Sequence, residues 1–247
     1  MNDIYIYDNN FNCLLNLISN LLKNNIKPHN IKNTNYNSNL LDNIIYLKIA
    51  EINLINIYYK LLGSENFKVV YYVFLSNNDN KELIIYYYLL NFIKYKEKVK
   101  YMRNLKCVSE AQKISKQVSR ENHRFKGFTR FKELKNKILY AEIAPDNNIL
   151  ELVSIHFKNR LKNEYWIIKD TKREIISIYD KNSFYILSEN EFKILDIEFS
   201  NDEKSVEDLW KSFYKNVGIK ERINKRCRMN FMPKKYWKNL IEVSDEL

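Results

Sequence analysis

Two side chains in the second half of the chain have the chemistry of an acid–base pair. A histidine can act as a general base, and His156 lies four residues before Arg160, so the two share one face of a helix. Asp170 opens the turn at residues 170–173, where it can accept a proton or orient Arg173. A core histidine and an aspartate that bonds its own turn are the ordinary alternatives. We predict His156 and Asp170 as the catalytic candidates, should the chain be an enzyme.

Basic and aromatic residues form a second set, with the chemistry of nucleic-acid binding. Residues 121–131 alternate cations with phenylalanines around Gly127, and residues 222–237 place cations around Asn224 before Tyr236 and Trp237. Arginine can hold a phosphate bidentately, and an aromatic ring can stack on an unpaired base. The predicted nucleic-acid contacts are Lys113, Lys116, Arg120, Arg124, Lys126, Arg130, Arg160, Arg173, Arg222, Asn224, Arg226, Arg228, Tyr236 and Trp237.

Each of these segments also has a plainer interpretation. The alternation in residues 121–131 suits a turn that rims a strand, but it equally suits a half-buried strand with its phenylalanines in the core. Residues 222–237 can be an exposed basic tail, although such a tail would leave Phe231 and Trp237 in water. Some arginines can be ordinary solvated surface residues or partners of carboxylates.

The net charge of +11 is concentrated in two segments. Residues 94–137 hold 15 Lys and Arg against 4 Asp and Glu, and residues 211–238 hold 10 against 1. All nine arginines lie between Arg103 and Arg228, and the rest of the chain is net acidic. This segregation predicts a polyanionic partner that two segments contact.

The scarcity of glycine and cysteine excludes several classes of protein. Phosphate-binding loops, dinucleotide fingerprints and nucleophile elbows need clustered glycines, whereas Gly63, Gly127 and Gly218 stand alone. Three isolated cysteines rule out a disulfide framework, an iron–sulfur cradle or a cysteine metal knuckle. No metal site is predicted. The longest apolar run, residues 83–93, is short of a membrane span, and with the unpaired thiols it predicts a cytoplasmic protein without membrane contact.

Hydrophobic periodicity predicts the elements that carry these residues. The first part reads as a strand over 4–7, a helix over 11–23, a polar loop over 24–40, a helix over 41–62 that Gly63 ends, and helices over 67–75 and 81–94. A further helix follows residue 108, with Lys113, Lys116, Arg120 and Arg124 as a cationic stripe. Strands over 138–144, 165–169, 174–180 and 184–187, and helices over 148–161, 206–217 and 234–243, complete the chain.

These elements predict an α+β fold. Its N-terminal half is helical, and its C-terminal half holds a small, mostly antiparallel sheet with flanking helices. Because no Gly/Ser linker or repeat interrupts the chain, we expect a single domain over 1–247, with a helical part at about 1–118 and a motif-bearing α+β part at about 119–247.

Several motifs in order resemble the DUF4130 family of DNA metabolism proteins. They are VSRENHRFKGFTRFKE (118–133), LYAEIAPDNNIL (139–150), HFKNR (156–160), WIIKDTKR (166–173), LWKSFY (209–214) and RINKRCRMNFMPKKYW (222–237). Tyr5 to Asp8 followed by a helix fits the same family, so the resemblance covers nearly the whole chain. Arg228 stands where the family commonly has Gln, and Lys225 where it often has Pro. If that Gln contacts a base, Arg228 changes the contact.

The resemblance implies a context more than a mechanism. It implies that members of the family are partners of a radical-SAM protein of DNA modification or repair. Domains similar to this one also occur fused to uracil-DNA-glycosylase-like domains. Any iron–sulfur or SAM chemistry would then belong to the partner, with no cofactor in this chain. We expect a DNA-binding protein of DNA repair or modification. The alternatives are an enzyme acting on a DNA base or lesion, similar to a glycosylase, an RNA-binding or RNA-processing module, and a scaffold for the radical-SAM partner.

Overall fold

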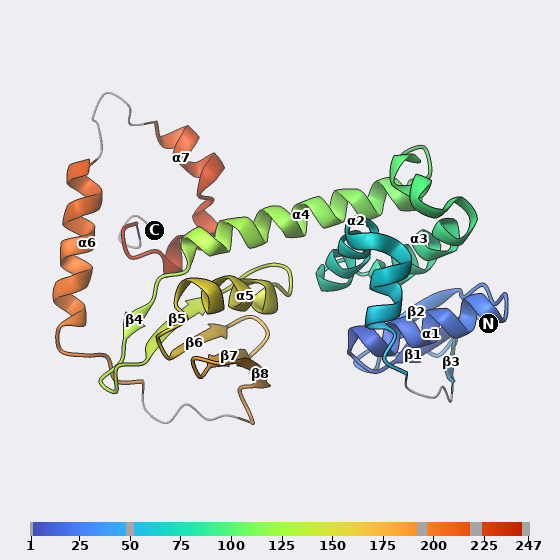
Figure 1. The fold of residues 1–247 in the computed structure, drawn as a ribbon, viewed down its shortest axis with the longest axis horizontal. Helices are drawn as coiled ribbons and strands as arrows, with labels where there is room; N and C mark the ends of the chain where they lie inside the picture. The colour runs from blue at the N-terminus through green and yellow to red at the C-terminus, as the bar shows by residue number, and fades with distance from the viewer. Residues whose placement is uncertain (1, 48–51, 192–196, 218–223, 244–247) are drawn as a thin grey trace. The chain divides into compact units, whose positions relative to one another are not determined.

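The chain divides into two compact units, Met1–Ser119 and Arg120–Leu247 (Figure 1). The computed structural model describes all residues except 1, 48–51, 192–196, 218–223 and 244–247. Helices and two sheets make it an α+β protein, as predicted. The division lies beside residue 118, where we expected the helical part to give way to the motif-bearing part. The single domain over 1–247 stays a prediction.

The first unit opens with a parallel three-stranded sheet. Its strands are β1 (Asn2–Tyr7), β2 (Asn30–Asn33) and β3 (Asp42–Tyr46), in the order β2-β1-β3. Helix α1 (Phe11–Lys23) follows β1 and buries an apolar face. The Asn10 side chain caps this helix by accepting a hydrogen bond from the Cys13 backbone N–H at 2.8 Å. The predicted first strand and first helix are therefore confirmed.

Two predictions for the first unit are wrong. Strand β2 lies within the predicted polar loop, and β3 occupies the start of the predicted helix over 41–62. Ile44 and Ile45 pair with Ile4 and Tyr5 of β1. The short apolar run around these two isoleucines fits the periodicity of a helix as well as that of a strand. Pairing with the distant strand β1 therefore decides that the run forms a strand.

The other elements of the first unit are helical. They are α2 (Ile55–Leu75), α3 (Lys81–Tyr95), the 3-10 helix η1 (Lys96–Tyr101) and the first part of α4 (Lys106–Phe128). Gly63 breaks α2 with φ 71°, a left-handed value that favours glycine, so the predicted helix stop is confirmed as a kink. Tyr88 donates to the Asn66 side chain at 2.8 Å, and Tyr7 donates to Glu82 at 3.0 Å. Both tyrosines are buried, so they belong to the core of the first unit.

The second unit is built on a five-stranded sheet. Its strands are β4 (Lys132–Glu133), β5 (Leu139–Ile143), β6 (Trp166–Asp170), β7 (Ile175–Tyr179) and β8 (Phe184–Ser188), in sequence order across the sheet. Among the described strands of this sheet, only β5 and β6 pair in parallel, with α5 (Leu150–Arg160) as the connection between them. The mostly antiparallel sheet and the helix between its strands are confirmed.

Helices complete the second unit, some of them unexpected. α4 continues to Phe128, so the strand or strand-rimming turn predicted over 121–131 is wrong. Glu121, Asn122 and Phe125 are buried at helical spacing, and Gly127 lies in this helix with open space beside it. α6 (Glu203–Val217) confirms the predicted helix, whereas α7 (Lys225–Phe231) was not predicted and η3 (Lys234–Asn239) replaces the last predicted helix. Gly218 lies outside the described residues.

Candidate nucleic-acid interface

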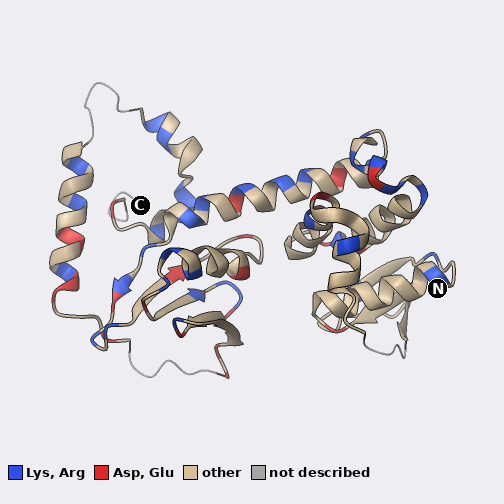
Figure 2. Ribbon diagram, in the orientation of Figure 1, with Lys and Arg blue, Asp and Glu red and all other residues tan. Residues whose placement is uncertain are grey.

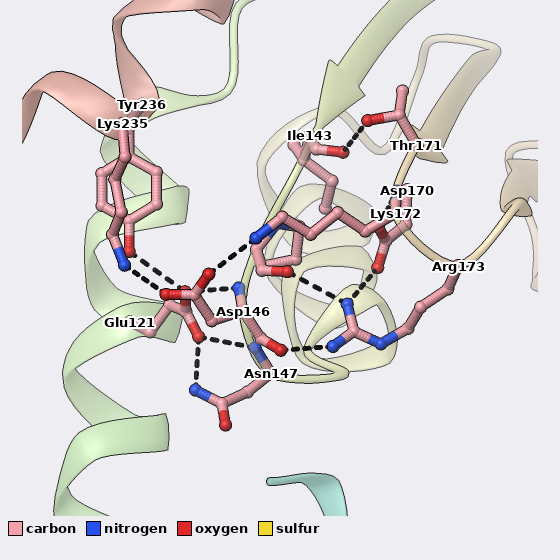
Figure 3. Close-up of polar contacts among 11 residues, drawn as sticks. Glu121, Ile143, Asp146, Asn147, Asp170, Thr171, Lys172, Arg173, Lys235 and Tyr236 are labelled. Carbon is pink, nitrogen blue, oxygen red and sulfur yellow. Dashed lines mark hydrogen bonds and ion pairs between the residues drawn. The ribbon is translucent and has the colours of Figure 1, made fainter. Parts of the chain in front are cut away.

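A buried glutamate of α4 holds the loop that joins β5 to α5. Glu121 accepts hydrogen bonds from the backbone N–H groups of Asp146 and Asn147 at 2.8 and 2.9 Å (Figure 3). It also accepts from Asn147 Nδ2 at 2.5 Å and from the Tyr236 hydroxyl at 3.1 Å. These four bonds use the acceptor capacity of one carboxylate. Sequence reasoning missed Glu121, although its position as the single acid between Glu110 and Glu133 was a usable signal.

An arginine holds the same loop from the β6–β7 turn. Arg173 donates to the carbonyl oxygens of Pro145 and Asp146 at 3.1 and 2.5 Å, and to the Asp170 carboxylate at 2.9 Å. Asp170 is 0% exposed and also accepts from the Lys172 backbone N–H at 3.0 Å. Burial raises the pKa of Asp170 above its ordinary value, although Arg173 opposes that shift. Both predicted site residues therefore make internal structural contacts.

Two lysines bind the remaining acid of this loop. Asp146 forms ion pairs with Lys172 at 2.6 Å and with Lys235 (Figure 3). Burial acts to raise the pKa of Asp146, but the two ammonium groups outweigh it and leave that pKa lowered. We call Glu121, Asp146, Asp170, Lys172, Arg173 and Lys235, with the loop at 144–147, the loop clamp. Its charges are matched within the protein.

Arg130 is likewise matched by a carboxylate. Its guanidinium group donates to both oxygens of Glu242, at 2.5 and 3.2 Å, and to the Gly127 carbonyl oxygen at 2.6 Å. Trp210 Nε1 donates to the same glutamate at 3.1 Å. A planar fork already engaged in this way has little capacity left for a phosphate. This predicted nucleic-acid contact has an internal role.

Tyr236 and Trp237 form part of the core of the second unit. They are 6% and 2% exposed, and the Tyr236 ring packs edge-on against Phe125 at 5.1 Å between centroids. Trp237 Nε1 donates to the Met232 carbonyl oxygen at 2.8 Å. Because both rings are covered, neither is accessible to a stacking base in this arrangement.

The predicted contacts on α7 have mixed roles. The Asn224 side chain caps the helix by accepting from the Cys227 backbone N–H at 2.9 Å. Arg228 lies over the Trp237 ring, with 4.9 Å between the guanidinium carbon and the ring centroid. Arg226 is exposed, and Arg222 lies outside the described residues. Among the members of this group that the structure describes, only Arg226 combines exposure with a cationic side chain.

Four predicted contacts on α4 and α5 of the second unit have no ion pair with any described carboxylate. Arg120 and Arg160 are exposed, and Arg124 and Lys126 are half-buried, on α4 and α5 of the second unit. We call them the unpaired cations. Figure 2 shows basic residues along α4. Lys113 and Lys116 are exposed in the part of α4 that belongs to the first unit. The predicted cationic helix is thus confirmed as a helix.

Lys126 lies off the cationic stripe of α4, and its charge acts on a histidine of α5. It follows Arg124 by two residues, which turns it roughly 160° around the helix. Burial first, and then the nearby charges of Lys126 and Arg160, lower the pKa of His156. The buried Nε2 of His156 has no hydrogen-bond partner among the described residues. His156 therefore lies in a cationic setting, whereas Asp170 is engaged by Arg173 in the loop clamp.

Two further findings concern the described residues alone. No group of three or more His, Cys, Asp or Glu side chains in the described part of the chain is arranged to hold a metal ion. Among the same residues, no helix has the length and apolar character that crossing a membrane would require.

The comparison with protein families agrees with the motifs. A family model described as a domain of unknown function, DUF4130, matches residues 79–242, which is more than half of the chain. The match includes all the motifs between residues 118 and 237, but Tyr5 to Asp8 lie outside it, so it covers less than we expected. No curated protein and no solved structure matches the chain.

Proposed function

Because the chain belongs to the DUF4130 family, whose description assigns no activity, we propose its function from the geometry: it binds nucleic acid through the unpaired cations of its second unit. We place this binding in DNA metabolism, as repair or modification of DNA in the cytoplasm. The context follows from the family resemblance. The binding itself follows from the charges.

One observation carries the proposal. In the second unit, Arg130, Lys172, Arg173 and Lys235 all have carboxylate partners, whereas the unpaired cations have none among the described residues. An ion pair is largely neutral toward a distant anion, but an unmatched cation keeps its field and attracts polyanions. The unpaired cations are therefore the ones that a phosphate backbone can neutralise.

The residue types fit phosphate contacts better than base recognition. Arginine can hold two phosphate oxygens with its planar fork, and lysine binds phosphate as a point charge. Exposed cations on helices select for charge rather than sequence, because base recognition needs side chains that reach the base edges. We therefore expect binding that depends weakly on sequence and strongly on salt.

The enzymatic alternative has less support. It needs a dry pocket that joins His156 or Asp170 to the cations, but the buried carboxylate of Asp170 is bonded to Arg173. His156 remains a candidate proton carrier beside Lys126 and Arg160. A base-directed reaction that depends on Asp170 is not what this geometry favours.

A salt series tests the proposal. Labelled single-stranded DNA, duplex DNA and RNA of matched sequence would be titrated with the full chain over a range of salt concentrations. We expect log Kd to change with log salt at a slope of roughly 0.9 per phosphate contacted in duplex DNA. A slope near zero would contradict the proposal, and binding confined to RNA would favour the RNA-binding alternative over DNA.

We also propose the radical-SAM protein as a partner, on the family resemblance alone. Any iron–sulfur or SAM chemistry then occurs in that protein. Co-purification of the two chains that survives nuclease and high salt supports direct contact. Loss of co-purification under both treatments points instead to tethering by nucleic acid.

A further inference from the structure

A pocket of about 490 Å³ in the second unit is separate from the unpaired cations. Residues of β4 and β5, the segment before α6, α6 itself and the end of the chain line it. Its volume is within the range of sites that hold small organic ligands. Neither the loop clamp nor the proposed phosphate contacts explain this pocket.

The walls of the pocket combine apolar and polar groups. Ile197, Phe199 and Ile241 supply apolar surface, and Phe199 is 39% exposed. Glu142 and Asn239 supply a carboxylate and an amide, and the Asn239 amide also donates to the Glu142 backbone carbonyl oxygen at 3.1 Å. An aromatic wall beside donors and acceptors suits a planar heterocycle with polar edges.

The basic residues that line the pocket differ in their contacts. Lys132 forms an ion pair with Glu207, and Arg130 is engaged by Glu242. Lys238 is exposed and has no ion pair with any carboxylate in the described ranges. A ligand that combines a planar base with an anionic group would match this lining better than a lipid or a bare phosphate would.

The wall that α6 forms is fastened by polar contacts at three points. Glu203 accepts from the Glu133 backbone N–H at 2.8 Å, Glu207 pairs with Lys132, and Trp210 donates to Glu242. The neighbouring apolar side of α6, with Val206, Leu209, Phe213 and Val217, is exposed. The pocket is therefore formed by specific contacts between α6 and the sheet edge.

We propose that this pocket binds a single nucleotide unit, with its base against Phe199, its polar edge at Asn239 and Glu142, and its phosphate at Lys238. The unit has two possible sources, a free nucleotide or a nucleotide extruded from a bound strand. The second source rests on the proposed function, because the unpaired cations would hold that strand. Extrusion of a base exposes the polar edges that such a pocket reads.

The fluorescent base 2-aminopurine distinguishes the two sources. The full chain would be mixed with oligonucleotides that carry one 2-aminopurine, and separately with 2-aminopurine nucleoside monophosphate. Unstacking of this base from its neighbours raises its fluorescence. We expect a rise in fluorescence on binding of the oligonucleotide if the source is a strand. If the source is the free pool, we expect the fluorescence of the free nucleotide to change on binding and that of the oligonucleotide to stay constant.

Substitution of Phe199 tests the pocket itself. F199S should raise the Kd for the 2-aminopurine probe about tenfold through loss of a stacking surface, and N239A should raise it as well. The matched control is F231S, because Phe231 on α7 is 75% exposed and does not line the pocket. F231S should behave as the wild type. Circular dichroism would check that each variant is folded.

The outcomes separate this proposal from the proposed function. If folded F199S and N239A bind both probes with the wild-type Kd, the pocket proposal is wrong, even if salt-dependent DNA binding persists. If neither probe gives a signal with the wild-type chain, it is also wrong. If the free nucleotide binds in a manner that F199S abolishes while DNA does not bind at all, the pocket proposal holds and the proposed function fails.

Discussion

The loop clamp and the unpaired cations use the same basic residue types for opposite purposes. In the loop clamp, Lys172, Lys235 and Arg173 each contact an aspartate, and the charges stabilise a loop. Arg120 and Arg124 on α4 have no such partner among the described residues. The difference is the presence of a carboxylate, so a basic residue becomes a candidate ligand for phosphate only when the fold leaves it unmatched.

The largest expected effect is loss of Arg173 from the loop clamp. R173Q leaves the buried Asp170 carboxylate without its cation, which should lower the free energy of unfolding by about 3–5 kcal/mol. Urea unfolding followed by tryptophan fluorescence measures this, because Trp166, Trp210 and Trp237 all belong to the second unit. The double variant D170N/R173Q should recover part of the loss, since no unpaired charge remains. Equal losses in both variants would contradict the ion-pair account.

Glu121 should produce the next largest effect. E121Q replaces an acceptor oxygen with a donor group that faces other donors, at a cost of roughly 2–4 kcal/mol of unfolding free energy. The same urea unfolding measures it. Glu164 is exposed, so E164Q serves as the matched control and should change the unfolding free energy by less than about 0.5 kcal/mol. A change in E121Q no larger than that of E164Q would show that the loop does not depend on Glu121.

A new carboxylate on α4 should give the unpaired cations an acidic neighbour, as the basic residues of the loop clamp have. Gln117 is exposed and lies three residues before Arg120 and four after Lys113. Q117E should weaken DNA binding about threefold at low salt, because the new charge neutralises a neighbour and repels phosphate. Fluorescence anisotropy measures the Kd, and Q117A is the control. An equal effect in Q117A would assign the change to lost contacts rather than to charge.

The smallest expected effect is a pH dependence from Asp146. Its pKa is lowered in the folded chain, so its ion pairs stabilise the fold above the ordinary carboxyl range and lose that contribution as pH falls through the lowered pKa. D146N should show a shallower fall in stability between neutral and acidic pH. Urea midpoints measured at several pH values report this. If the stability of both proteins falls by the same amount between neutral and acidic pH, Asp146 contributes nothing to the pH dependence.

Much of the fold could be predicted because its signals are local. Apolar spacing predicted α1, α3 and α5, and a central turn predicted the β6–β7 hairpin. Strands β2 and β3 were missed because parallel pairing with β1 is a long-range contact that short sequences do not encode. The segment at 121–131 was misjudged because cations and aromatics alternate there, while buried Glu121 and Phe125 follow helical spacing.

The sequence predicted which residue types form the candidate site, but not which of the cations have carboxylate partners. The sequence shows that arginines cluster, but the carboxylate that each one meets comes from a distant segment. Glu242 lies 112 residues from Arg130, and Asp146 lies 89 residues from Lys235. Tyr236 and Trp237 were expected to stack on bases, yet the fold uses them as core. Spatial proximity therefore had to be known before paired and unmatched cations could be separated.

One paired measurement tests the central claim most directly. The salt dependence of duplex DNA binding would be compared for the wild type, for R120Q/R124Q and for K100Q/K135Q, whose lysines pair with Glu65 and Glu198. Each variant loses two positive charges. We predict that R120Q/R124Q lowers the log–log slope by about 2 and that K100Q/K135Q leaves it unchanged. An equal fall in both variants, or a flat salt dependence in the wild type, would contradict the account.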